Sequence, residues 1–323
     1  MKALVCEQYG PPDTLVYKDV PSPAIQPGHV RIAVSACGVN FPDTLIIEGK
    51  YQIKPEPPFS PGAEIAGEIT EVGEGVDHLK AGDRVLALTT WGGFAEELVV
   101  PQHLVIPIPD QMDYATASAF LLTYGTSYYA LKQRARLQKG ESILVMGAGG
   151  GVGISAVELA NAMGAHVIAA ASSQEKLDLA EKRGAKEFIN YSEQDLKSTL
   201  KQMTGGKGVD VIYDPIGGDL FEAAFRNMAW NGRALIIGFV GGISKLPTNL
   251  PLLKNASVVG VFWGAFTSNE PQESKRNNEE LMQMYCDGKL SPAISQTYKL
   301  ENGAEALNAL INRTATGKLV IEP

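Results

Sequence analysis

Cysteine and histidine are scarce in this chain of 323 residues. The three cysteines, Cys6, Cys37 and Cys286, are widely spaced and odd in number, which argues against a disulfide framework and fits a reducing cytoplasm. The four histidines show no spacing typical of metal ligands, and we therefore expect no metal site. They are His29, His78, His103 and His166.

Basic runs and long apolar runs are also lacking. The formal net charge of −8 would repel a phosphate backbone, so we expect no nucleic-acid partner. No apolar run approaches the roughly 20 residues of a membrane helix, so we expect no membrane association. The chain reaches an acidic residue at Glu7, too early for the apolar region of a signal peptide, and we expect a cytoplasmic protein.

The length is about twice that of a usual domain and favours two domains. The first part of the chain is β-rich. Residues 30–34 alternate in polarity with period two, and residues 64–72 and 84–88 form short apolar runs between prolines and glycines. Short strands separated by such residues predict a compact, barrel-like β domain over residues 1–121.

From residue 142 onward, the signals of strands and helices alternate. Short strands are predicted at residues 143–146, 166–170, 187–189, 209–213 and 233–237. Strands joined by helices need crossover connections, so residues 122–262 predict a doubly wound domain with a parallel sheet. Residues 263–323 are too few for a further domain, and we expect them to pack back on the N-terminal one.

A glycine-rich turn follows the first strand of the doubly wound domain and opens a helix. Its sequence is Gly147-Ala148-Gly149-Gly150-Gly151-Val152-Gly153. Glycines let a backbone approach a pyrophosphate, and the helix N-terminus offers unpaired N–H groups. The strict G-x-G-x-x-G pattern is modified, with Ala148 where the usual first glycine would sit. We predict cofactor contacts from Gly147, Gly150, Gly151, Val152 and Gly153; the alternative is a glycine-rich turn without a ligand.

The end of the next strand distinguishes NADP from NAD. NAD enzymes usually carry an acidic residue there for the ribose 2′-hydroxyl, whereas this chain has Ser172, Ser173 and Lys176. The one nearby acid, Glu175, can form a capping box with Ser172. We therefore predict NADPH as the cofactor. The alternative for Lys176 is an ordinary solvated helix lysine.

The whole chain resembles the medium-chain dehydrogenase/reductase superfamily, and most closely its quinone oxidoreductases, the group that includes ζ-crystallin. Besides the glycine turn, the resemblance rests on Gly38-Val39-Asn40-Phe41-Pro42-Asp43, Pro61-Gly62-Ala63-Glu64-Ile65-Ala66-Gly67, Gly82-Asp83-Arg84-Val85, Thr123-Tyr124-Gly125-Thr126 and Phe188-Ile189-Asn190-Tyr191. It implies an α/β protein with a GroES-like β-rich domain, formed by residues 1–121 and 263–323, and a Rossmann domain over residues 122–262.

The zinc alcohol dehydrogenases of the same superfamily provide a contrast. They place a cysteine ligand where this chain has Asn40, and a histidine followed by glutamate where it has Ala63-Glu64. Asparagine and alanine cannot replace thiolate and imidazole on zinc. The resemblance therefore implies a zinc-free enzyme that reduces an activated acceptor, a quinone or a conjugated carbonyl, by hydride transfer from NADPH.

The resemblance also implies roles for individual residues. Asn40, Asp43, Tyr51 and Thr126 are expected around the nicotinamide, with Asn40 and Tyr51 as candidate hydrogen-bonding or proton-donating groups. The alternatives are that Asp43 caps the helix after Pro42 and that Tyr51 only forms a wall of the cleft. Family positions at the adenosine phosphate and ribose are matched by Ser172, Ser173, Lys176 and Tyr191. Segments on the nicotinamide side contain Phe239, Val240, Phe262 and Gly264.

Residues 258–261 correspond to the strand that pairs subunits in the family, so we expect a homodimer. The expected partner is a small-molecule acceptor. Two other readings stay open. A reductase of alkenals or enoyl thioesters would share the fold, the cofactor and the lack of zinc, and a protein that binds NADPH without catalysis could have a structural or regulatory role.

Overall fold

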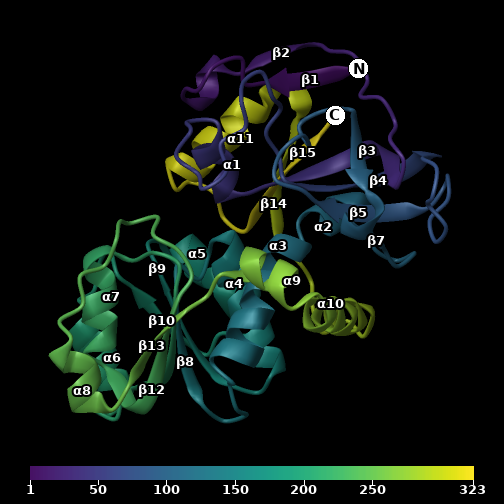
Figure 1. The fold of residues 1–323 in the computed structure, drawn as a ribbon. Helices are drawn as coiled ribbons and strands as arrows, with labels where there is room; N and C mark the ends of the chain where they lie inside the picture. The colour runs from purple at the N-terminus through teal and green to yellow at the C-terminus, as the bar shows by residue number, and fades with distance from the viewer. The chain divides into compact units, whose positions relative to one another are not determined.

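The computed structural model describes all residues, Met1–Pro323, and the chain divides into two compact units (Figure 1). The first unit contains Met1–Leu122 and Pro292–Pro323, and the second contains Thr123–Ser291. The sequence predicted the return to the first unit at residue 263. Residues 263–291 instead pack with the second unit, because Phe266 stacks on Tyr129 with ring centroids 4.1 Å apart and Glu280 pairs with Lys132.

The first unit is built on a seven-stranded sheet in the order β14-β15-β3-β4-β5-β7, with β6 also paired to β3. The strands are β3 (His29–Val39), β4 (Glu64–Val72), β5 (Arg84–Leu88), β6 (Glu97–Pro101), β7 (Val105–Pro107), β14 (Ile294–Lys299) and β15 (Lys318–Glu322). A separate sheet pairs β1 (Lys2–Val5) with β2 (Val16–Asp19). The β-rich fold predicted for this part of the chain is confirmed.

Side-chain alternation explains how the first sheet forms its core. Along the first half of β3, buried and half-buried residues alternate, so that Val30, Ile32 and Val34 face the apolar core. The core also includes Leu307 from α11. The helices of this unit are α1 (Phe41–Ile46), α2 (Tyr114–Ser118) and α11 (Gly303–Ile311), and α3 (Leu121–Tyr129) runs across the boundary into the second unit.

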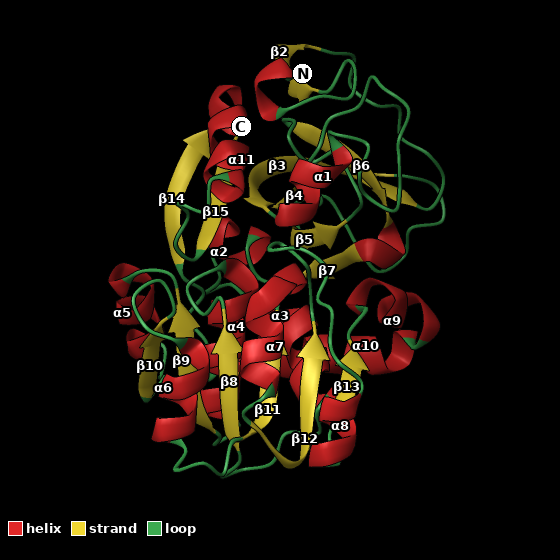
Figure 2. Ribbon diagram, turned by 90° about the vertical axis from the view of Figure 1, so that its left-hand side faces the viewer, coloured by secondary structure: helices red, strands yellow, loops and turns green.

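The second unit contains a six-stranded sheet in the order β10-β9-β8-β11-β12-β13, in which every pair is parallel. Figure 2 shows the strands side by side with their arrows in one direction. The strands are β8 (Ser142–Met146), β9 (His166–Ala171), β10 (Glu187–Asn190), β11 (Val209–Asp214), β12 (Met228–Ile236) and β13 (Ser257–Gly260). The predicted doubly wound parallel sheet is confirmed.

Helices cover this sheet on both faces (Figure 1). The covering helices are α4 (Gly151–Ala162), α5 (Gln174–Lys182), α6 (Leu196–Met203), α7 (Gly218–Phe225) and α8 (Asn249–Lys254). The unit also contains α9 (Trp263–Asn269) and α10 (Pro271–Cys286), which contact each other. Because both faces are covered, Ile143 to Met146 of β8 are fully buried, and this produces the continuous apolar run seen in the sequence.

The strand order fixes where a ligand can bind in this unit. The chain moves outward from β8 to β10, then returns to the other side of β8 with β11. This reversal creates a switch point between β8 and β11, and ligands of open α/β sheets bind outside the carboxyl ends of the strands at such a point. The glycine turn after β8 lies at this end.

Candidate functional site

The glycine turn joins β8 to α4 through backbone that side chains do not obstruct. Gly147 adopts φ +61°, a left-handed conformation that favours glycine. A Cβ on Gly153 would lie 2.1 Å from the carbonyl oxygen of Gly147, so the start of α4 packs this closely only with glycine there. A Cβ on Gly150 would meet nothing nearer than 3.5 Å.

The N-terminus of α4 is suited to a phosphate. Gly150 is the N-cap residue, and no side chain caps the helix. The first N–H groups of an α-helix lack intrahelical partners and carry partial positive charge, so they attract anions. The space beside Gly150 is the room that a pyrophosphate needs to approach these groups. The residues of the turn therefore fit the dinucleotide predicted for them.

Lys176 lies over the glycine turn. A Cβ on Gly149 would come within 2.4 Å of the Lys176 Cβ, which explains why this position must be glycine. The Lys176 ammonium lies 3.5 Å from the Ser172 hydroxyl, to which it donates. The structure thus brings the predicted cation and the predicted hydroxyl together beside the turn.

The helix that carries Lys176 differs in one detail from the sequence prediction. The predicted capping box of Ser172 and Glu175 is wrong, because α5 begins at Gln174 with Ser173 as its N-cap and no side chain caps it. The Ser172 carbonyl instead accepts a hydrogen bond of 2.9 Å from Ser192. Tyr191 donates its backbone N–H to Ala171, so the ends of β9 and β10 lie together.

Two loops at the carboxyl ends of β11 and β12 are joined by hydrogen bonds. Gly218 donates its N–H to Gly242 over 2.8 Å, and Gly241 donates to Ile216 over 2.7 Å. The buried Asp214 carboxylate accepts N–H groups from Ile216 and Gly217 at 2.8 and 3.0 Å. Burial raises the pKa of Asp214, although these N–H groups favour its ionised form. No local pattern in the sequence indicates this anchor.

Phe239 and Val240 project from the second of these loops. Their side chains are 54% and 37% exposed. Such exposure of large apolar side chains at the ligand end of the sheet favours contact with a ligand over core packing. Phe262, at 64% exposed, is similar, whereas its neighbour Trp263 is buried.

Trp263 lies between the two helices that carry Thr126 and Gly264. A Cβ on Gly125 would lie 2.6 Å from the Trp263 indole ring, so α3 and α9 approach closely only at a glycine. Thr126 follows Gly125 in α3, and Gly264 follows Trp263 in α9. The two predicted contact residues therefore lie on helices that pack together.

A hydroxyl cluster lies behind the glycine turn. Ser127 of α3 bonds to Ser155 of α4 at 2.9 Å and to the Tyr213 hydroxyl of β11 at 2.8 Å. Each group is buried and each is satisfied by the others, which stiffens such a network. Because these partners are far apart in sequence, no local pattern could reveal the cluster.

In the first unit, Asp43 and Asn40 form the turn that begins α1. The Asp43 carboxylate accepts the backbone N–H of Asn40 at 2.7 Å, so Asp43 does cap this helix. Burial raises the pKa of Asp43 to about 7, although the Asn40 N–H and the Lys318 ammonium favour its ionised form. The half-buried Tyr51 lies near enough that burial and the Asp43 carboxylate both raise its pKa.

The Asn40 amide belongs to an internal network. Its oxygen accepts from the Lys318 ammonium at 2.6 Å, and its nitrogen donates to Glu64 at 3.0 Å and to the Gly38 carbonyl at 3.2 Å. The side chain is only 4% exposed. The sequence suggested that this amide bonds a substrate, but the structure engages both its oxygen and its nitrogen within the protein. Glu64 and Lys318 were not recognised as site residues from the sequence.

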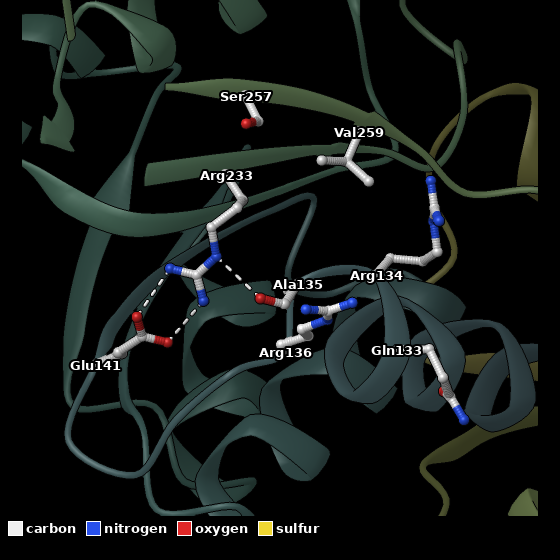
Figure 3. A pocket seen from close by; sticks show the side chains of 8 residues that line it. All are labelled: Gln133, Arg134, Ala135, Arg136, Glu141, Arg233, Ser257 and Val259. Atoms are coloured by element: carbon white, nitrogen blue, oxygen red, sulfur yellow. Dashed lines mark hydrogen bonds and ion pairs between the residues drawn. The ribbon is translucent and has the colours of Figure 1, made fainter. Parts of the chain in front are cut away.

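A pocket of about 580 Å³ lies elsewhere in the second unit (Figure 3). Its lining residues are Gln133, Arg134, Ala135, Arg136, Glu141, Arg233, Ser257 and Val259. Arg233 lies level with Ile143 and Ser257, at the amino ends of β8 and β13 and thus away from the glycine turn. Its guanidinium is neutralised by Glu141 through bonds of 2.8 and 2.7 Å, as Figure 3 shows. None of the predicted site residues lines this pocket.

No group of three or more His, Cys, Asp or Glu side chains is arranged to hold a metal ion. None of the helices combines the length and the apolar character needed to span a bilayer.

A GroES-like β unit joined to a doubly wound unit with this glycine turn defines the class of medium-chain dehydrogenases/reductases. Residues 26–110 match the family described as Alcohol dehydrogenase GroES-like domain, and residues 151–279 match Zinc-binding dehydrogenase.

Individual relatives define the family more narrowly. The chain is 41% identical over 325 residues to quinone oxidoreductase-like protein 2 homolog of Nematostella vectensis, covering 99% of this chain and 88% of that protein. It is 34% identical to the Rattus norvegicus quinone oxidoreductase, covering 99% and 97%. The Escherichia coli quinone oxidoreductase complexed with NADPH matches with a TM-score of 0.93 and 28% identity over all of both chains. The chain therefore belongs to the quinone oxidoreductase family.

We predict that Asp43→Asn removes a pH dependence of stability. The pKa of Asp43 is about 7 in the folded protein and near 3.8 when exposed, so the folded state binds this proton more tightly. The resulting stabilisation is full below about pH 4 and is lost as the pH rises through about 7, on the order of 4 kcal/mol. Urea unfolding of wild type and variant across this range measures the difference.

The Asn side chain can still accept the Asn40 N–H, so the helix cap is kept. The exposed Asp110 of the same unit provides the control, and Asp110→Asn should leave the wild-type pH profile unchanged. Parallel profiles for wild type and Asp43→Asn would contradict a proton held at Asp43.

Proposed function

We propose that this chain is an NADPH-dependent reductase of quinones and related conjugated carbonyls that works by hydride transfer without zinc. The observation that supports this most directly is the Lys176 side chain lying over Gly149, which brings a cation beside the glycine turn. The NADPH complex of the similar Escherichia coli enzyme supports the same cofactor. When bound, NADPH supplies the hydride, and the residues of the chain bind it and orient the acceptor.

In this proposal, different parts of the second unit hold different parts of the cofactor. The pyrophosphate is held by Gly147, Gly150, Gly151, Val152 and Gly153. The adenosine 2′-phosphate and ribose are held by Ser172, Ser173, Lys176 and Tyr191. The nicotinamide side is contacted by Thr126, Phe239, Val240, Phe262 and Gly264.

The absence of a zinc role is proposed from the donor groups of the chain. An amide at Asn40 and a methyl group at Ala63 are not zinc ligands, and the Asn40 oxygen is engaged by an ammonium at 2.6 Å. A quinone does not need a Lewis acid to make it electrophilic. It needs a hydride and a group that stabilises the negative charge that develops on its oxygen.

Tyr51 is the proposed hydrogen-bond donor to that oxygen. It is half-buried, and burial and the Asp43 carboxylate raise its pKa further above the neutral range, in which a tyrosine hydroxyl is protonated and can donate. Asp43 is fully enclosed and is proposed to act from behind the site as a store for one proton. For Asn40 we propose that the amide holds the turn of Asp43 in place, since Lys318 and Glu64 already engage it.

The chain is further proposed to act as a cytoplasmic homodimer. β13 is the outermost strand of its sheet, and Val258 on it is exposed. An uncovered apolar edge strand is a surface that proteins normally pair or protect, and pairing with a second copy would do so.

The proposed activity is tested by oxidation of NADPH, followed at saturating cofactor, with 1,4-benzoquinone, 9,10-phenanthrenequinone, acrolein and crotonyl-CoA. We expect turnover with the quinones. Turnover with acrolein or the thioester alone would assign an alkenal or enoyl-thioester reductase instead. Tight NADPH binding with no turnover of any acceptor would indicate a structural or regulatory protein.

We predict that Lys176→Ala raises the KM for NADPH by roughly 10- to 100-fold, because a charge-assisted contact with the 2′-phosphate is lost. The KM for NADH, which lacks this phosphate, should stay within about twofold. The exposed Lys182 on the same helix gives a matched control, Lys182→Ala. Equal effects of Lys176→Ala on both cofactors would remove Lys176 from the phosphate site.

We predict that Tyr51→Phe lowers kcat for quinone reduction by about 100-fold, because one donor to the developing oxyanion is lost. The Kd for NADPH should not change, since the ring and the fold are kept. Tyr17→Phe, at an exposed tyrosine of the same unit, is the control. An unchanged kcat in Tyr51→Phe would make Tyr51 a wall of the cleft.

A further inference from the structure

Lys318 is an ammonium inside the protein. Its side chain is only 4% exposed, although lysine is among the residues least often buried. Burial of an isolated ammonium is strongly unfavourable unless it is paired and hydrogen-bonded. A lysine in such a place therefore needs partners, and the fold provides them at the ends of three strands.

The backbone places Lys318 by two local features. Gly317 before it adopts φ +71°, and a Cβ there would lie 2.4 Å from the Ala293 carbonyl. The Lys318 N–H then bonds to that same carbonyl at 2.7 Å. Next, β15 pairs with β3 so that Leu319 faces Val39, which puts Lys318 across from Asn40.

Three acceptors surround the ammonium, one for each of its protons. They are the Asn40 amide oxygen at 2.6 Å, the Val39 carbonyl at 3.2 Å and a Glu64 carboxylate oxygen at 3.3 Å. Lys318 therefore joins β15 to the turn before α1 and to the start of β4.

Glu64 completes the network and is itself fully buried. One of its oxygens accepts the backbone N–H of Leu122 at 2.8 Å, and the other accepts the Asn40 amide N–H as well as Lys318. The Asn40 amide is thus held from both sides. Its backbone N–H in turn binds the Asp43 carboxylate, so the order of contacts runs from Lys318 to Asn40 to Asp43.

We propose that Lys318 is a positioning residue of the reductase, whose buried ammonium fixes, through Asn40 and Glu64, the turn that carries Asp43. This inference rests on the proposed function. A purely structural role needs no charge here. Two apolar side chains of similar size in place of Lys318 and Glu64 would fill the space at no greater cost in stability. Asp43, Glu64 and Lys318 instead bring together two carboxylates and one ammonium. This excess of carboxylates favours a proton on Asp43, whose pKa is raised.

The electrostatic surroundings of Asp43 come from every element around it. Its titratable and charged neighbours are Cys37 on β3, Glu64 on β4, Lys318 on β15 and Tyr51 beyond α1. Lys318 is the only cation among them. Its removal should therefore raise the pKa of Asp43 further, in addition to releasing the Asn40 amide.

The test is Lys318→Met, which keeps the length of the side chain and removes the charge. We expect kcat for quinone reduction to fall roughly 10- to 100-fold from the misplaced turn. The Kd for NADPH should stay within about twofold, because the phosphate-binding residues lie in the other unit. Carboxyl ¹³C NMR should show the Asp43 titration moved to higher pH. Lys299→Met, at an exposed lysine of neighbouring β14, is the matched control.

A second pair of variants separates positioning from folding. Lys318→Ala leaves space for a small amine, so added ethylammonium should restore kcat. A neutral alcohol of similar size, which lacks the charge, should not. If the single variants fail to fold, Lys318→Met combined with Glu64→Gln removes both charges, and kcat is then the deciding measurement, because the losses of Lys318 and Glu64 act in opposite directions on the pKa of Asp43. Wild-type kcat together with an unmoved Asp43 titration in a folded single variant, or wild-type kcat in the double variant, would overturn the proposal.

The outcome for Lys318 can be distinguished from that for the activity. If the wild type itself reduces no quinone, the proposed function fails, while the NMR titration still decides whether Lys318 acts on Asp43. If the wild type is active and the variant matches it, only the role of Lys318 fails.

Discussion

An α-helix that begins without any side chain in front of it is the feature on which the proposed function of this protein depends. The start of α4 is left open by Gly150, and its close approach to β8 requires Gly153. Partial charge at the helix N-terminus is useful for binding only if an anion can reach it. The switch in strand order between β8 and β11, the hydroxyl cluster behind α4 and the Lys176 side chain over Gly149 all gather around this one helix end.

The first unit supplies a different kind of chemistry. It buries two carboxylates, Asp43 and Glu64, and the Lys318 ammonium lies 3.3 Å from Glu64 and 2.6 Å from the Asn40 amide oxygen. Buried charges are weak contributors to stability, and their persistence is better explained by the position that they impose on a functional group. A fixed internal ammonium holds the Asn40 turn here, and this is consistent with chemistry that uses donor groups of the protein rather than a metal.

Local patterns in the sequence predicted the frame of the second unit well. The strands at 143–146 and 166–170 are buried apolar runs, and the glycine turn between the first strand and its helix is a local signal. The Ser172 cap was wrong because the neighbouring Ser173 takes that position. The sequence prediction placed residues 263–291 in the other domain. It missed the stacking of Phe266 on Tyr129, because this contact joins segments that are distant in the chain. The role of Lys318 could not be predicted for the same reason, because its partner Asn40 lies 278 positions away in the chain.

The most direct test of the open helix end is calorimetric titration of NADPH into the wild type and into Gly150→Val. A side chain at this position fits the fold, because Gly150 has extended backbone and no neighbour within 3.5 Å of a Cβ, but it fills the space proposed for the pyrophosphate. We predict one NADPH bound per wild-type chain and at least a 100-fold weaker Kd in the variant, at an unchanged Tm. Equal affinity in both proteins, or no binding by the wild type, would contradict a dinucleotide at this turn.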